Sequence, residues 1–279
     1  MAVVTFLNQK GGVGKTSSVH HLGGTFAKAG RRILLVDADP QSSLTQGLLG
    51  PEALDALDPS ETIAAVLAGD DPFLDQVVRD SGAEGLDLLP GSPAANDSNV
   101  PRPWEQPLEV QMRLRATLSE LASRYDLVLV DCPPTLSGCS WAALLAADGL
   151  VVPLQAEDYG AQGVRAIQDW LHAVRSGPNP TLRLLGYLIT MFNPRLAIHK
   201  AYDNRLRSAY GNEVFATAVP YAADFKESIA ARQTIARYKP RGASAKVLQA
   251  LATELVQRLE ADVDERVTDA DRKPGTEAA

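Results

Sequence analysis

The chain has 279 residues, of which 45% are hydrophobic and 22% charged, an ordinary globular composition with a net charge of −7. It contains no apolar run of about 18 residues, so a membrane-spanning helix is not expected. The start, MAVVTFLNQK, becomes polar too early for a signal peptide. Two cysteines, Cys132 and Cys139, are too few for a disulfide framework. These features favour a cytoplasmic protein.

Short apolar strands alternate with helical patterns along the chain, and this alternation predicts βαβ units and a parallel sheet. The run VVTFLN (3–8) predicts the first strand, and the apolar spacing over 16–29 predicts the helix that follows it. Residues 91–107, with clustered Pro, Asn and Ser, predict an irregular loop. We also expect strands at 32–40, 85–92, 126–134, 149–155, 182–192 and 213–219, and helices from Thr62 and over 108–125, 160–175, 196–210, 222–232 and 243–261.

A single α/β domain over residues 1–261 accounts for these elements, because no long linker divides them. From Glu260 onward the sequence is acidic and aperiodic, with seven acids and three bases. A segment of this composition cannot bury enough apolar surface to fold. We therefore expect a disordered acidic tail over residues 262–279.

The stretch NQKGGVGKTSS (8–18) lies between the first strand and the first helix, which is the context in which a glycine-rich loop binds phosphate. Backbone N–H groups of such a loop converge on phosphate oxygens, and the helix N-terminus favours negative charge. Lys15 is expected to reach the β- and γ-phosphates, Thr16 to ligate Mg²⁺ and Ser17 to contact the α-phosphate region. This context predicts a P-loop NTPase with a mostly parallel, twisted sheet flanked by helices on both faces. The predicted nucleotide-binding residues of the loop are Gly11, Gly12, Val13, Gly14, Lys15, Thr16 and Ser17.

Two later strands end in aspartates that can complete this site. Asp131 follows LVLV and is expected to hold Mg²⁺ through a water, with a plain helix cap as the alternative. Asp37 and Asp39 close the strand RILLVDADP, and a carboxylate beside the γ-phosphate can orient or deprotonate the attacking water. DADPQ can also be a simple turn, an interpretation that fits Asp37 better than Asp39. The predicted metal-site residues are Thr16, Asp39 and Asp131.

The motifs KGGVGKTS, LLVDADPQ and YDLVLVDCPP together resemble the ParA family of deviant Walker ATPases, relatives of MinD. The similarity extends from Met1 to about Ala261. The resemblance implies slow hydrolysis of ATP with Mg²⁺. It also identifies Lys10 as a signature lysine that reaches the ATP of a partner subunit, which implies a homodimer in the ATP-bound state. Lys10, Lys15 and Asp39 are then the catalytic residues. For Lys10 the alternative is a solvated surface lysine.

The same resemblance places the adenine base near the end of LITMFNPR and the turn VPYAAD. Met191 and Pro220 are expected to pack on the faces of the base, and Asn193 to hydrogen-bond its edge. Each of the three can equally be an ordinary strand-end or turn residue.

Positive charge is concentrated in one part of this acidic chain. Residues 195–246 hold ten Lys/Arg and four Asp/Glu, so the remainder carries −13. Such asymmetry favours a polyanion-binding face, although a solvated set of helix surfaces explains it equally well. The resemblance implies non-specific DNA binding by the ATP-bound dimer. The expected contacts are Arg195, Lys200, Arg205, Arg207, Lys226 and Arg241, with Arg232, Arg237 and Lys239 as further candidates.

The resemblance as a whole implies a cytoplasmic, nucleoid-associated ATPase that partitions a plasmid or chromosome, or positions a cargo, with a ParB-like or other adaptor protein. The glycine loop begins within ten residues of Met1, which predicts the short form without an N-terminal DNA-binding domain. A MinD-like membrane-surface ATPase is the alternative, but an anionic bilayer would repel the acidic C-terminus, so no membrane partner is expected. Cys132 beside Asp131 raises a third possibility, a metal-cluster carrier akin to the nitrogenase iron protein.

Overall fold

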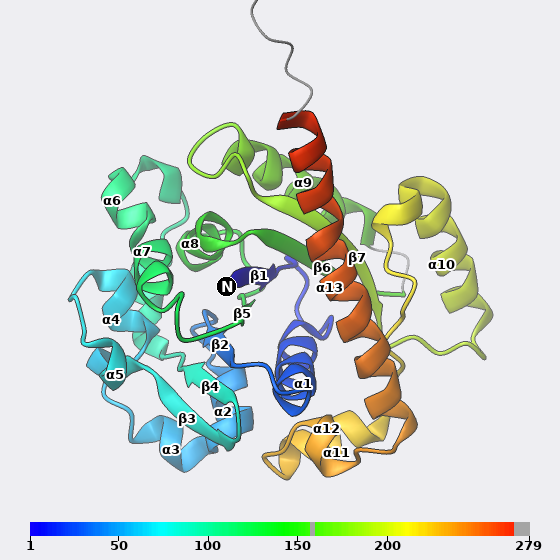
Figure 1. Ribbon diagram of the computed structural model, residues 1–279, viewed down its shortest axis with the longest axis horizontal. Helices are drawn as coiled ribbons and strands as arrows, with labels where there is room; N and C mark the ends of the chain where they lie inside the picture. The colour runs from blue at the N-terminus through cyan, green and yellow to red at the C-terminus, as the bar shows by residue number, and fades with distance from the viewer. Residues whose placement is uncertain (157–159, 271–279) are drawn as a thin grey trace, which may run out of the picture.

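A seven-stranded sheet forms the centre of the computed structural model, in the order β3-β4-β2-β5-β1-β6-β7 (Figure 1). The structure describes residues 1–156 and 160–270, with side chains over 1–156 and 164–261. Neighbouring strands are parallel except β3 and β4, which pair antiparallel. The strands are β1 (Ala2–Phe6), β2 (Ile33–Asp37), β3 (Arg79–Ala83), β4 (Leu86–Leu89), β5 (Leu127–Asp131), β6 (Gly149–Gln155) and β7 (Arg183–Thr190).

Helices cover both faces of this sheet (Figure 1). Helices α1, α2, α11, α12 and α13 contribute to the apolar layer on one face, and α4, α7, α8 and α9 to the layer on the other. The α-helices are α1 (Lys15–Lys28), α2 (Ser43–Leu49), α3 (Pro51–Asp55), α4 (Ile63–Ala68), α5 (Leu74–Val77), α6 (Leu108–Gln111), α7 (Arg113–Glu120), α8 (Gly138–Ala146), α9 (Gly160–Arg175), α10 (Ala197–Tyr210), α11 (Ala223–Ala230), α12 (Ile235–Tyr238) and α13 (Ala243–Ala270). The 3₁₀ helices are η1 (Pro59–Glu61), η2 (Pro93–Ser98), η3 (Pro103–Glu105) and η4 (Gly211–Glu213).

Side chains alternate between the two layers along the central strands, because successive residues of a strand point to opposite faces. In β2, Ile33 and Leu35 join the layer of α1 and α13, whereas Leu34 and Val36 join the layer of α7 and α8. All four side chains are fully buried. Burial on both sides explains why these strands are continuous apolar runs, and the arrangement confirms the predicted α/β fold.

Two predicted elements take a different form. Residues 213–219 form no continuous strand. The N–H groups of Phe215 and Val219 donate to carbonyls of β7, but between them the N–H groups of Ala216 and Thr217 donate to the Glu254 carboxylate. The helix expected over 108–125 divides at Met112 into α6 and α7 and ends at Glu120.

Three other segments hold more structure than the sequence predicts. The edge strand β3, RDSGA, lacks an apolar run because its side chains are only partly buried. The expected loop 91–107 contains η2 and η3, and Asn99 fixes it by accepting hydrogen bonds from Ser137 Oγ (2.6 Å) and Cys139 N (3.1 Å). Helix α13 continues past the expected end at 261 to Ala270. The rest of the predicted tail, 271–279, lies outside the described residues. Within the described part of the chain, no helix is long and apolar enough to cross a membrane.

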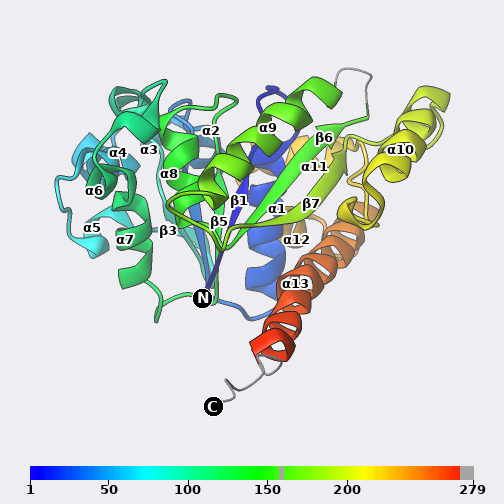
Figure 2. The same cartoon turned by 90° about the horizontal axis from the view of Figure 1, so that it is seen from above.

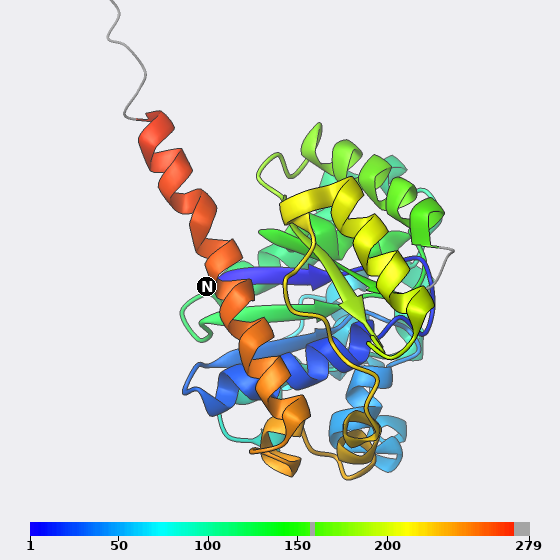
Figure 3. The same cartoon turned by 90° about the vertical axis from the view of Figure 1, so that its right-hand side faces the viewer.

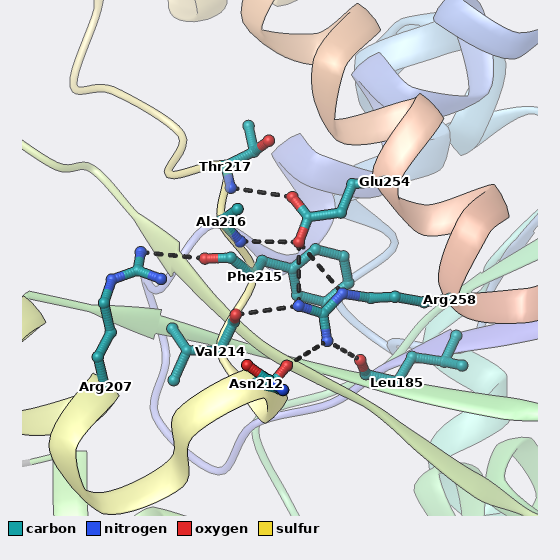
Figure 4. A network of polar contacts seen from close by, with 9 residues as sticks. All are labelled: Leu185, Arg207, Asn212, Val214, Phe215, Ala216, Thr217, Glu254 and Arg258. Atoms are coloured by element: carbon teal, nitrogen blue, oxygen red, sulfur yellow. Dashed lines mark hydrogen bonds and ion pairs between the residues drawn. The ribbon is translucent and has the colours of Figure 1, made fainter. Parts of the chain in front are cut away.

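Arg258 of α13 ties the C-terminal helix to the edge of the sheet (Figure 4). Its guanidinium lies 4.2 Å from the centroid of the Phe215 ring. Glu254, one helical turn earlier, pairs with it at 3.0 Å. The guanidinium also donates to three backbone carbonyls of β7 and the segment after α10, those of Leu185 (2.8 Å), Asn212 (3.0 Å) and Val214 (2.9 Å).

Replacing Arg258 with alanine is expected to lower the free energy of unfolding by about 2–4 kcal/mol, because it removes the donor to the backbone carbonyls and leaves the Glu254 carboxylate without its charge partner. Urea unfolding followed by circular dichroism measures this change. Lys246→Ala, at an exposed position of the same helix, is the control and should cost less than about 0.5 kcal/mol. Equal costs for the two variants would contradict a stabilising role for the network.

Candidate nucleotide site and basic surface

The glycine loop leaves β1 at the edge of the sheet where the parallel strands have their carboxyl ends (Figure 2). Phe6, the last residue of β1, is in register with Asp131 of β5, and Asp131 is in register with Asp37 of β2. The loop that follows Phe6 therefore begins beside both strand-end aspartates. Parallel α/β sheets place their ligand sites at this edge.

The conformation of the loop explains its glycines. Gly12 and Gly14 have φ values of 75° and 80°, a region that side chains disfavour. A Cβ added at Gly12 would meet nothing within 4 Å, so space remains open around this part of the loop. The loop is anchored from both sides: Thr190 Oγ1 donates to the Val13 carbonyl (2.7 Å), and Asn8 Nδ2 donates to the Pro153 carbonyl (2.6 Å). This anchoring presents the backbone N–H groups in a fixed arrangement.

The two lysines of the loop occupy different environments. Lys15 begins α1, is only 6% exposed, and donates from Nζ to the Lys10 carbonyl at 3.3 Å. Burial lowers the pKa of Lys15, while the nearby Asp131 and Asp39 act in the opposite direction. Lys10, in contrast, is exposed. The buried lysine thus faces the aspartates of its own chain, and the exposed one lies on the outside of the loop.

Asp131 is a buried carboxylate that lacks the partners such a group normally has. It is fully buried, and neither oxygen receives a hydrogen bond within the described structure. Burial, followed by the charge of Asp37, raises the pKa of Asp131 well above its usual value. Thr16 is near enough to lower this pKa somewhat, although no hydrogen bond within 3.5 Å reaches either oxygen. A buried carboxylate is costly unless it is paired, so this position suits a cation.

Asp37 and Asp39 differ in how far the fold already uses them. Asp37 is fully buried, and its Oδ2 accepts hydrogen bonds from the N–H (2.8 Å) and hydroxyl (2.7 Å) of Thr45 at the start of α2. Burial raises the pKa of Asp37 to about 7, against the effect of these bonds. Asp39 is 8% exposed, and its Oδ1 accepts from the Gln41 N–H (2.9 Å). Asp37 is therefore held by Thr45 at the end of β2, whereas Asp39 closes the turn of DADPQ with the Gln41 N–H and lies slightly closer to solvent.

Three residues that support the site were not identified from the sequence, namely Thr190, Thr45 and Gly91. Thr190 holds the loop at Val13 and is a polar strand end after the apolar run of β7. Thr45 bonds Asp37 and also accepts from the Gly91 N–H (2.8 Å), which links β2, α2 and the end of β4. A threonine after an apolar strand was the available signal for Thr190, whereas nothing in the sequence pairs Thr45 with Gly91.

The expected adenine residues lie together beside the loop. Met191, which has a φ of 51°, follows β7, and a Cβ built on Gly14 would lie 3.8 Å from its Cε atom. Pro220 is brought alongside by an isolated bridge to Phe192. Asn193 Oδ1 accepts from the Arg195 N–H (3.0 Å) and so fixes the turn after the strand. The structure therefore places all three near one side of the glycine loop, and their contact with a base stays a prediction.

Most of the basic residues of 195–246 are exposed, and several of these are also bonded within the chain. Arg207, one of the predicted DNA contacts, is only partly exposed, because it donates to Asp203 (2.7 Å) and to the Phe215 carbonyl (3.0 Å); Figure 4 shows the second of these bonds. Among the further candidates, Arg232 pairs with Glu52, Arg237 donates to the Gly82 carbonyl and Lys239 pairs with Asp224. The other five expected contacts are exposed, namely Arg195, Lys200, Arg205, Lys226 and Arg241, and so are Arg232, Arg237 and Lys239.

These exposed side chains lie in two regions of one subunit. Arg195, Lys200 and Arg205 lie on or just before α10, the yellow helix in Figure 3, whereas Lys226 lies on α11, far from α10 in Figures 1 and 3. Lys226 Nζ lies 5.4 Å from the centroid of the Tyr221 ring. One subunit therefore does not present these residues as one compact patch.

Both cysteines are buried thiols beside the site. Burial raises the pKa of Cys132 well above its usual value and that of Cys139 to about 12. Over the residues that the structure describes, no group of three or more His, Cys, Asp or Glu side chains is arranged to hold a metal ion. In the described structure both cysteines are small buried residues of one apolar layer.

This fold and loop define the chain as a P-loop nucleotide-binding protein. A family model described as an AAA domain matches residues 1–184. Among solved structures, cobyrinic acid a,c-diamide synthase from Mycobacterium smegmatis, with bound ATP analog and magnesium, is similar at a TM-score of 0.75 and 27% identity, over 94% of this chain and 97% of that chain.

Two characterised relatives identify the family more closely. The chromosome-partitioning ATPase Soj of Thermus thermophilus is 37% identical over 257 residues, which cover 92% of this chain and 96% of Soj. The chromosome partitioning protein ParA of Caulobacter vibrioides is 31% identical over 260 residues, with 92% and 95% covered. The chain belongs to the ParA/Soj family of chromosome-partitioning ATPases, which confirms the resemblance carried by its three motifs.

Proposed function

We propose that this protein is an ATP-dependent switch. ATP and Mg²⁺ bind at the glycine loop, two ATP-bound subunits form a homodimer, and the dimer binds DNA without sequence preference. A ParB-like or other adaptor stimulates slow hydrolysis and releases the dimer, so that a plasmid, chromosome or other cargo is moved in the cytoplasm over the nucleoid. The observation that carries this proposal is the difference between two lysines of one loop: Lys15 is buried beside the aspartates, and Lys10 is exposed.

The described residues fit a magnesium–nucleotide complex. Gly12 leaves open space where phosphate oxygens would approach the loop, and the buried Lys15 supplies a positive charge at the end of the loop. Asp131 offers two buried oxygens without other partners, and Thr16 lies near it. Mg²⁺ is typically bound by one or two such groups together with waters and phosphates, and when bound it offsets phosphate charge. The ATP analog and magnesium in the M. smegmatis structure support this assignment.

Asp39 is the aspartate that we assign to hydrolysis. Asp37 is fully buried and held by Thr45, so its carboxylate serves the fold. Asp39 has one oxygen fixed by the Gln41 N–H and retains access to solvent. A carboxylate fixed in this way can orient a water molecule and accept its proton.

Lys10 is assigned to the partner subunit's nucleotide. Two ATP molecules between two subunits bring a dense negative charge to the interface, and a cation donated from each side offsets it only when both nucleotide and partner are present. Dimer formation then depends on the γ-phosphate, and hydrolysis dissolves the dimer.

ATP-dependent DNA binding tests the proposed function. The wild-type protein is expected to bind a random-sequence duplex with Mg²⁺ and ATP but not with ADP, as measured by fluorescence anisotropy. Lys200→Glu should weaken this binding at least about tenfold and reduce the salt slope by about two, because the dimer carries two copies of Lys200 and each makes about one phosphate contact.

Arg31→Glu makes the same charge reversal outside the basic segment, just before β2 and at the opposite end of the sheet from the glycine loop. It should leave DNA affinity unchanged, and both variants should still dimerise with ATP. If Lys200→Glu and further reversals at Arg195 and Arg241 all leave DNA affinity untouched, these side chains are a solvated surface and DNA is not bound there.

A further inference from the structure

All three tryptophans of the chain lie together on the surface formed by η3, α8 and α9. The ring centroids of Trp141 and Trp170 are 5.3 Å apart, those of Trp104 and Trp141 are 5.9 Å apart, and those of Trp104 and Trp170 are 6.1 Å apart. Each pair meets edge to face. Trp141 is also fixed by a hydrogen bond from its Nε1 to Gln111 (2.7 Å). The cluster is therefore a pre-arranged aromatic surface.

A hollow of about 690 Å³ opens over this cluster. It is lined by the three tryptophans together with Leu108, Ala173 and Pro178, so its walls are mainly apolar. Trp104 is 49% and Leu108 60% exposed, which leaves two large apolar side chains in contact with water. Contiguous exposed apolar surface of this kind marks interaction sites.

The charge around this tryptophan hollow is negative. Asp169 is the only charged residue of its described lining, and Glu109 follows Leu108 on α6. Neither carboxylate makes an ion pair or hydrogen bond within the described structure, whereas Glu105 is already paired with Arg102. A carboxylate beside exposed tryptophan faces attracts Lys or Arg, through both its charge and the rings.

We propose that the tryptophan hollow is a docking site for a segment of a partner protein in which an apolar side chain stands next to a Lys or Arg. The apolar side chain fills the hollow, and the cation lies over an exposed ring and pairs with Asp169. Buried aromatic anchors are where binding energy concentrates in interfaces. This inference rests on the proposed function and deepens it. It names the surface of this chain that the adaptor contacts and the kind of residues that the adaptor uses.

The position of the hollow suits an adaptor. Trp141 lies on α8, which follows β5, the strand that ends in Asp131. Asn99, in the segment that also carries Trp104, bonds Ser137 and Cys139 at the start of α8. A docked segment therefore contacts elements that are joined directly to the strand end of the nucleotide site.

Selection from a phage-displayed library of random twelve-residue peptides tests the proposal, with the full chain as bait and Trp104→Ser for counter-selection. We expect enriched peptides to carry an apolar residue next to Lys or Arg. Because all the tryptophans lie in the hollow, their fluorescence reports on this site alone, and binding of the synthesised peptides should change it. Leu108→Ser and Asp169→Lys should each weaken peptide binding at least about tenfold.

Phe73→Ser removes another exposed aromatic side chain, 76% exposed and outside the hollow, and should bind the peptides as the wild type does. All variants should bind ATP normally, so a failure of docking is distinguished from a failure of the proposed ATP switch. The proposal is overturned if no peptide is enriched, if enriched peptides are acidic, or if Leu108→Ser and Asp169→Lys bind them as tightly as the wild type. Displacement of the peptide by excess Trp104→Ser chain, which does not itself bind the peptide, would identify a second copy as the occupant and would also overturn it.

Discussion

Lys15→Ala is expected to weaken ATP binding at least about 100-fold, which corresponds to about 2.7 kcal/mol. Lys15 is buried beside Asp131 and Asp39, so its removal leaves phosphate groups facing two carboxylates without the cation between them. Removing one member of a buried charge pair leaves the other uncompensated. ATP-dependent dimerisation and DNA binding should be lost together with nucleotide binding. Isothermal titration calorimetry with Mg²⁺ and ATP measures the affinity.

Lys10→Ala is the matched control for this variant, because it removes a lysine from the same loop at an exposed position. If Lys10 acts only across a subunit interface, the Lys10→Ala monomer should bind ATP nearly as tightly as the wild-type monomer. A Lys15→Ala protein that binds ATP within tenfold of the wild type would contradict the role of Lys15 in holding the phosphates.

Asp39→Ala is expected to slow ATP hydrolysis by roughly 10²–10⁴-fold, the range for loss of a general base. ATP binding, dimerisation and DNA binding should persist, since Lys15, Thr16 and Asp131 are unchanged. The variant should therefore remain on DNA after addition of ATP, where the wild type is released. Single-turnover phosphate release measures the chemical step, and fluorescence anisotropy follows retention on DNA.

Asp55→Ala removes an exposed carboxylate at the end of α3 and should leave turnover unchanged. Asp39→Ala should also keep the thermal stability of the wild type, because within the described structure the Asp39 side chain accepts a single backbone hydrogen bond, from Gln41. Normal turnover by Asp39→Ala would mean that another group activates the water. The Asp39 carboxylate would then serve only the turn that it closes with the Gln41 N–H.

The sequence predicted the phosphate loop and the strand-end aspartates because their chemistry is local. A strand, a glycine loop and a helix are adjacent in the chain. Parallel strands bring Asp37 and Asp131 to the same edge of the sheet, whatever the order of the strands within it. The fully buried β2 and β5 were recognisable for a similar reason, as apolar runs. The sequence favoured a structural role for Asp37 over Asp39, but it did not reveal the partner of Asp37, a threonine on α2.

The errors concern side chains whose partners are distant or were overlooked. Residues 213–219 have the composition of a strand, but Glu254 on α13 takes two of their N–H groups. For Arg207, the charge of the segment and the family resemblance suggested a DNA contact but not its bonds within the chain. Its pairing with Asp203 four residues earlier is a spacing at which helical side chains meet, and so it could have been anticipated. The tryptophan cluster unites three separate segments that no sequence pattern connects.

Mixing two inactive variants tests most directly whether Lys10 completes the site of another subunit. In a mixed dimer of Lys10→Ala and Asp39→Ala subunits, the Lys10→Ala subunit keeps its own Asp39 and receives Lys10 from its partner. That site alone is complete. We predict that each variant alone hydrolyses ATP at the background rate, and that an equal mixture recovers up to roughly a quarter of the wild-type rate, since about half the dimers are mixed and each has one complete site. A mixture no more active than the separate variants would contradict the assignment of Lys10 to the partner's nucleotide.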